Sequence, residues 1–135
     1  MNIMDIEEYK KQWIDHFRGD VPARRIQKYV VATGNLIWHL FSWELVPSRD
    51  YLQGDRARKA FDSLCAYQKE QSLVIEPFAD RDAYTLPAHL LIAKKLDKYI
   101  EIYVTANDYS WTYIKTHEGD LCGPYFYQPK TEKTK

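Results

Sequence analysis

The fold is decided by one stretch in the C-terminal third, residues 99–118, which reads YIEIYVTANDYSWTYIKTHE. Two runs rich in β-branched and aromatic residues flank an Asn-Asp pair at 107–108, and such a pair favours a tight turn. The second run ends in three polar residues, Thr-His-Glu, at 116–118. The stretch therefore predicts a β-hairpin that places its reactive side chains at the end of a strand.

Alternation along the two runs assigns the side chains to two faces of the hairpin. A two-residue loop at 107–108 pairs Val104 with Trp111. The face expected to pack on helices consists of Ile102, Val104, Ala106, Tyr109, Trp111 and Tyr113. The opposite, more polar face consists of Glu101, Tyr103, Thr105, Ser110 and Thr112. By the same alternation His117 falls at the edge of the packed face, with its two neighbours pointing the other way.

Apolar residues at helical spacing predict helices elsewhere in the chain. They are expected over 6–17 with Asp5 as N-cap, over 26–33 before Gly34, over 57–65 and over 88–97. Strands are predicted at 72–76 and, as a short edge strand, at 125–127. The run at 36–46 is apolar on both parities, which suits a central strand and equally admits a buried helix.

These elements predict a single α+β domain over residues 1–129, followed by a disordered tail at 130–135. The domain is expected to have N-terminal helices and a small, mainly antiparallel sheet of about four to five strands that includes the C-terminal hairpin. The length of 135 residues suits one domain, and a composition of 45% hydrophobic and 15% aromatic residues supplies a sizeable core.

Charge and cysteine usage narrow the function classes. Nineteen basic and nineteen acidic residues cancel, which argues against nucleic-acid binding and leaves little charge repulsion to oppose a homo-oligomer. No apolar run has membrane-spanning length and the N-terminus lacks signal-peptide features, so a cytoplasmic location without membrane contact is expected. Cys65 falls on the apolar face of the 57–65 helix and is expected to be buried, whereas Cys122 lies in a loop.

Four segments occur together in a recognisable order. They are LIWHLFSW at 36–43, GDRARKAFD at 54–62, WTYIKTHE at 111–118 and GPYF at 123–126. In this order and chain length they resemble a small bacterial family of unknown function. The resemblance covers most of the chain from residue 35 onward and implies a cytosolic, stand-alone domain. It implies no activity, and no catalytic residue follows from it.

Candidate catalytic residues gather at the predicted hairpin end: His117, Glu118 and Asp120. A histidine beside carboxylates suits a general base, and with His39 nearby it suits a metal-dependent hydrolase or nuclease. The alternative is that His117 and Thr116 bond loop backbone and close the hairpin against 123–124. His39 is expected to be a core histidine bonded to a group such as Ser42. No metal site and no cofactor are predicted, because no recognised motif for either is present.

Aromatic residues are the candidates for binding: Trp43, Tyr125 and Tyr127 are expected to be partly exposed, as is Tyr51. Exposed Trp and Tyr often mark contact surfaces. With no catalytic motif in the chain, the balance favours a non-enzymatic binding or regulatory domain that contacts a protein partner or a small ligand. The alternative is the small metal-dependent hydrolase or nuclease described above.

Overall fold

A computed structural model describes residues 5–34, 36–79, 82–118 and 121–129, and within these residues the chain forms six α-helices and a five-stranded antiparallel sheet. The predicted α+β class is thereby confirmed. The predicted tail at 130–135 lies outside the described residues, as does Asp120. Across the described ranges, no helix has both the length and the apolar character needed to cross a membrane.

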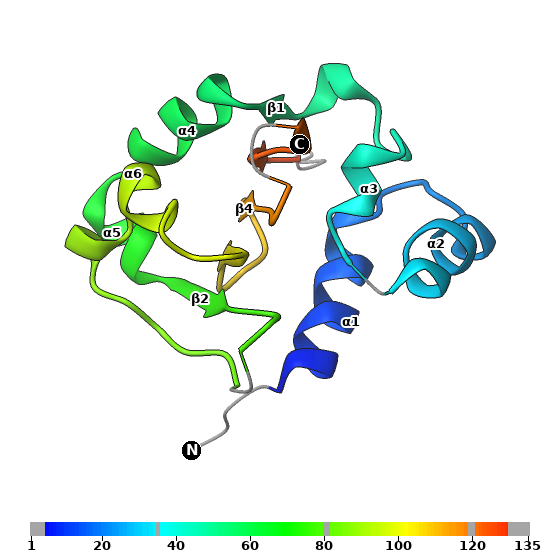
Figure 1. Cartoon of the computed structure of the whole chain (residues 1–135), viewed down its shortest axis with the longest axis horizontal. Coiled ribbons are helices and arrows are strands. Elements are labelled where there is room, and N and C mark those ends of the chain that lie inside the picture. The colour runs from blue at the N-terminus through cyan, green and yellow to red at the C-terminus, as the bar shows by residue number, and fades with distance from the viewer. Residues whose placement is uncertain (1–4, 35, 80–81, 119–120, 130–135) are drawn as a thin grey trace, which may run out of the picture.

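The sheet separates two groups of helices (Figure 1). Its strands pair in the order β1 (Leu52–Gln53), β5 (Tyr125–Tyr127), β4 (Thr112–Lys115), β3 (Ile102–Ala106) and β2 (Ser72–Ile75). One group consists of α1 (Ile6–Phe17), α2 (Ala23–Tyr29) and α3 (His39–Ser42), and the other of α4 (Asp55–Asp62), α5 (Ala66–Glu70) and α6 (Ala93–Leu96). Each group contributes to its own hydrophobic cluster against the sheet. Because β5 lies between β1 and β4, the prediction that 125–127 is an edge strand is wrong.

The N-terminal helices follow their predicted signals. Asp5 caps α1, since its carboxylate accepts a hydrogen bond from the Glu8 backbone N–H at 2.8 Å. Apolar spacing then buries one face of α1 completely against the sheet, as expected of an amphipathic helix. The second predicted helix is α2 followed by a 3₁₀ turn, η1 (Val31–Thr33), and it ends at Gly34, whose φ of 104° suits glycine.

The apolar run at 36–46 contains one short helix between turns and no strand, so the strand alternative is wrong. It forms the short helix α3 and then turns at Glu44, whose φ is 53°. A backbone hydrogen bond of 3.1 Å from the Val46 N–H to the Leu40 carbonyl folds the segment back on itself. Residues on several sides of this compact turn are therefore buried, and this explains why the run is apolar on both parities.

Two predicted helices are interrupted. The 88–97 helix is split into a 3₁₀ turn, η3 (Ala88–Leu90), and α6, because Ile92 is extended with φ −128°. The Asp62 carboxylate accepts a 2.9 Å hydrogen bond from the Ala93 N–H and so caps α6 from another helix. The 57–65 helix ends at Asp62, and Cys65 is the exposed residue that precedes α5, so the prediction that its thiol is buried is wrong.

The hairpin exists, but its register differs by two residues from the prediction. Val104 lies opposite Tyr113 and not opposite Trp111, because the loop spans residues 107–110. Tyr109 in this loop has φ 60° and stacks on His16 of α1, with ring centroids 4.2 Å apart. A shift of two preserves the alternation, so the other five predicted packed-face residues do share one cluster.

The face predicted to be more polar is also buried. Thr105 and Thr112 have at most 1% of their surface exposed, because α1 covers them. The hydroxyl of Thr105 bonds that of Tyr9, and the indole N–H of Trp13 donates to the Thr112 hydroxyl at 3.0 Å. Alternation locates the two faces correctly, but it does not reveal that helices cover both of them.

Candidate functional site

A buried carboxylate lies at the open end of the β3–β4 hairpin. The Glu101 side chain, just before β3, has no exposed surface. Its Oε2 accepts hydrogen bonds from the Trp38 indole N–H at 3.0 Å and from the Tyr103 hydroxyl. Its Oε1 lies 2.9 Å from the His117 backbone N and 2.6 Å from the ring Nδ1 of the same residue. These contacts compensate for the cost of removing a carboxylate from water.

The partners of Glu101 determine where the proton of His117 lies. An indole N–H and a backbone N–H can only donate. Burial, together with the charge of Glu101 and the bond to it, raises the pKa of Tyr103 well above its usual value, so this hydroxyl keeps its proton and donates. An ionised Glu101 accepts all four contacts and requires a proton on Nδ1 of His117. The second ring nitrogen, Nε2, is then the one left for contacts other than Glu101.

The Nε2 atom of His117 lies 3.4 Å from Oε2 of Glu118, and the two side chains are 33% and 43% exposed. The side chains of His117 and Glu118 therefore lie together as candidate site residues. Strand alternation had predicted that they point to opposite faces. The reason is that β4 ends at Lys115, so the alternation stops before these residues. Asp120, the third candidate, lies outside the described residues.

His117 belongs to the opposite side of the sheet from the one predicted. It contacts Glu101 and the ring of Trp38, which is a member of the cluster shared with α1–α3. Among the described residues of the loop, which omit 119–120, the expected bonding to loop backbone is found for Thr116, whose hydroxyl donates to the Cys122 carbonyl. Gly123 adopts φ +108°, and a Cβ there would lie 3.3 Å from Thr116, so the loop closes tightly at a glycine.

His39 occupies the same region from α3. As predicted, it bonds Ser42, with 2.8 Å between Nδ1 and the hydroxyl oxygen, but it is only partly buried. Burial is the main cause that lowers the pKa of His39. The charge of Glu101 raises this pKa, and the nearby His117 lowers it further. An imidazole with a lowered pKa is neutral near pH 7 and can accept or donate a hydrogen bond.

A continuous series of ring contacts joins these residues, and we call it the aromatic row. In order, it consists of Tyr29, Trp43, His39, Trp38, His117 and Phe78, with successive centroids 5.7, 6.2, 4.4, 5.7 and 5.4 Å apart. Trp43 is 52% exposed and Phe78 is 54% exposed. Their partial exposure leaves two large aromatic side chains at the surface, with two imidazoles between them.

The predicted binding residues separate into two groups. Trp43 is exposed, as expected, and is part of the aromatic row. Tyr125 and Tyr127 are buried on β5, where they pack against Phe41 beneath the sheet, so the prediction of exposure is wrong for both. Tyr51 is buried likewise, with its hydroxyl bonded to a backbone carbonyl. Burial raises the pKa of Tyr125 and Tyr127, consistent with this placement.

Sequence reasoning missed Glu101, the residue that organises the site. The only available signal was an isolated acidic residue at the start of a strongly β-forming run, which alternation assigned to a polar face. Within the described parts of the chain, no group of three or more His, Cys, Asp or Glu side chains is arranged to hold a metal ion.

Comparison with known proteins identifies a family for this chain but no activity. No curated protein and no solved structure matches it. The resemblance to an uncharacterised family, inferred from four short segments, is confirmed by a match that extends over most of the sequence. A family model described as "Domain of unknown function (DUF4275)" matches residues 4–126, and the chain therefore belongs to that family.

Proposed function

We propose that this domain is non-enzymatic and acts by binding a protein partner or a small ligand through the aromatic row. One observation carries the proposal: the row presents two half-exposed aromatic side chains, Phe78 at one end and Trp43 next to the Tyr29 end. Large aromatic side chains are enriched among residues that dominate binding energy, because they bury much area with few rotatable bonds. A binding role accounts for leaving this apolar surface in water.

The chemistry between these two anchors suits a mixed apolar and polar contact. The side chains of His117 and His39 are both partly exposed, with Trp38 between them. At one end of the row, the cationic groups of Arg25 and Lys28 lie 5.8 and 5.2 Å from the Tyr29 ring centroid. A partner segment with apolar side chains and an acidic group would therefore complement the row. Both cysteines are free, which fits the reducing cytoplasm as the place of action.

Site-specific photo-crosslinking tests this proposal. The photoreactive residue p-benzoylphenylalanine would replace Trp43 in one variant and Tyr67 in a matched control, since Tyr67 is also exposed but lies outside the row. In cells that produce the protein, we expect a discrete adduct from position 43 that excess wild-type protein competes away and that Phe78→Ala removes. Equal adducts from both positions, or an adduct indifferent to Phe78→Ala, would contradict the proposal.

The paired Glu101 and His117 support a second candidate, a small hydrolase. A buried carboxylate on Nδ1 of a partly exposed histidine is the arrangement that orients histidine bases in several unrelated enzymes. Nitrophenyl esters and phosphodiesters, assayed with and without added Mn²⁺ or Zn²⁺, separate the two candidates. Turnover that is lost in His117→Ala and retained in Trp43→Ala would favour the hydrolase, whereas no turnover under any condition supports the binding domain.

A further inference from the structure

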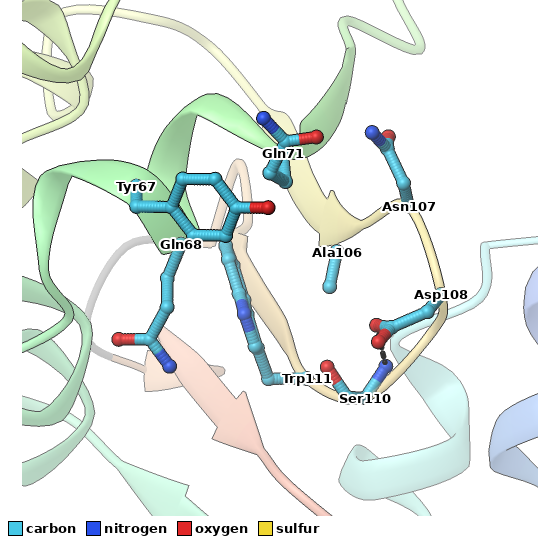
Figure 2. A pocket seen from close by; sticks show the side chains of 8 residues that line it. All are labelled: Tyr67, Gln68, Gln71, Ala106, Asn107, Asp108, Ser110 and Trp111. Carbon is cyan, nitrogen blue, oxygen red and sulfur yellow. Dashed lines mark hydrogen bonds between the residues drawn. The ribbon is translucent and has the colours of Figure 1, made fainter.

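A pocket lies at the turn end of the β3–β4 hairpin, away from the aromatic row. It has a volume of about 350 Å³ and opens between α5 and the hairpin loop. Its lining consists of Tyr67, Gln68, Gln71, Ala106, Asn107, Asp108, Ser110 and Trp111. Figure 2 shows the rings of Tyr67 and Trp111 near the middle of the view and the loop residues Asn107, Asp108 and Ser110 along its other side.

Two hydrogen bonds of the hairpin loop hold the walls of this pocket in place. The Asn107 N–H donates to the Gln71 carbonyl at 2.8 Å, which ties the hairpin loop to the residue that follows α5. Inside the loop, the Asp108 carboxylate accepts a 3.0 Å hydrogen bond from the Ser110 N–H. A site whose walls are already fixed loses little conformational freedom when a ligand binds.

The polar groups of the pocket are suited to a ligand with hydroxyl groups. Three carboxamides line it, and those of Gln71 and Asn107 make no hydrogen bond within the part of the chain that the structure describes. Carboxamides both donate and accept, as hydroxyl groups do. Asp108 adds an acceptor whose pKa is lowered mainly by its bond to Ser110, so it stays ionised at neutral pH.

The apolar part of the lining is a ring surface. Tyr67 is 73% exposed, and its ring borders the pocket together with the largely buried Trp111 (Figure 2). An exposed ring can cover the C–H face of a sugar, while the polar edge of the sugar bonds amides and a carboxylate. Among the residues that the structure describes, no Lys or Arg lines the pocket, which disfavours phosphate or carboxylate ligands. A purely apolar ligand would leave the carboxamides without partners.

We propose that this pocket binds one sugar unit, a hexose or an N-acetylhexosamine, with the ring of Tyr67 against its C–H face and the carboxamides of Gln71 and Asn107 on its hydroxyl groups. This site is independent of the aromatic row, since the two share no residue. The proposal therefore adds a ligand to a domain whose partner surface lies elsewhere.

The experiment is an NMR titration of the ¹⁵N-labelled full chain with glucose, galactose and N-acetylglucosamine, each to high millimolar concentration. We expect saturable shifts from at least one sugar in the side-chain amide signals of Gln71 and Asn107 and in the backbone signal of Asp108. Tyr67→Ala should weaken binding about tenfold, equivalent to about 1.4 kcal/mol. Its high exposure means that removing this side chain should leave the fold intact, which the same spectrum checks.

Two controls separate this result from the proposed function. Glu70→Ala alters an exposed α5 residue that does not line the pocket, and Trp43→Ala alters the aromatic row. Both variants should bind the sugar as the wild type does. The proposal is overturned if none of the three sugars gives saturable shifts, if the shifts lie outside the pocket, or if Tyr67→Ala binds normally. Gln71→Ala provides a second variant with the same expected loss.

Discussion

The two faces of the sheet are built on different principles. Against α1–α3 the sheet presents a connected set of polar groups, in which Thr105 and Thr112 bond each other and reach Tyr9 and Trp13 of α1. Glu101 extends this polarity to the hairpin end. Against α4 and α6 the sheet contributes mainly aliphatic and aromatic side chains. The first face requires its buried polar atoms to keep their partners in addition to its apolar packing, whereas the second depends mainly on filled volume.

The largest effect is expected from removing the carboxylate at the polar face. Glu101→Ala leaves the indole N–H of Trp38 and the hydroxyl of Tyr103 without their acceptor, and it deprives His117 of its buried partner. We expect a loss of about 3–5 kcal/mol in the free energy of unfolding, measured by urea denaturation. Glu118→Ala removes the partly exposed carboxylate beside His117 and should change the free energy of unfolding by less than about 0.5 kcal/mol. Similar small losses in both variants would show that Glu101 is not an organising residue.

A double-mutant cycle tests whether the polar face acts as a connected network. Thr105→Val removes the middle hydroxyl and leaves that of Tyr9 buried without this partner, at an expected cost of about 1–3 kcal/mol. Adding Tyr9→Phe removes the stranded hydroxyl, so the double variant should lose less than the sum of the two single variants. A coupling energy of about 1 kcal/mol supports the network, and strict additivity would contradict it.

The apolar face should respond to volume and ring geometry. Phe61 of α4 stacks on Tyr113 with ring centroids 4.3 Å apart, and its side chain is completely buried. Phe61→Leu keeps most of the volume and removes the stacked pair, so we expect a loss of about 1–1.5 kcal/mol by thermal or urea unfolding. Phe61→Met is the control, because it also removes the ring but introduces a flexible side chain. If Phe61→Leu lowered the free energy of unfolding as much as Glu101→Ala does, the contrast between the two faces would be wrong.

The smallest effect is a pH dependence at the edge of the polar face. Burial lowers the pKa of His39, so the unfolded chain binds a proton more tightly than the folded chain does. The contribution of His39 to stability is therefore present above its usual pKa of about 6.5 and is lost as the pH falls below it. In His39→Asn, the loss of stability between neutral and mildly acidic pH should be smaller than in the wild type. An identical pH profile for both proteins would argue against a lowered pKa.

Features that depend on neighbours along the chain could be predicted. The Asp5 cap, the end of the second helix at Gly34 and the strand at 72–75 all follow from residues within a few positions of one another. Side-chain alternation assigned most of the hairpin residues to the correct face, because that assignment survives a register shift of two. The shift itself arose from the four-residue loop, in which Tyr109 adopts a positive φ that its residue type does not announce.

By itself, then, the sequence determined the α+β class, the main elements and the family of this protein, since these depend on local periodicity and short segments. Only the tertiary structure decided which polar residues matter. Glu101 receives donors from Trp38, 63 residues away, and from His117, 16 residues away. Exposure was decided in the same way, as Trp43 stays at the surface while Tyr125 does not. Burial and the pairing of polar groups depend on contacts between elements remote in the sequence, which no local pattern encodes.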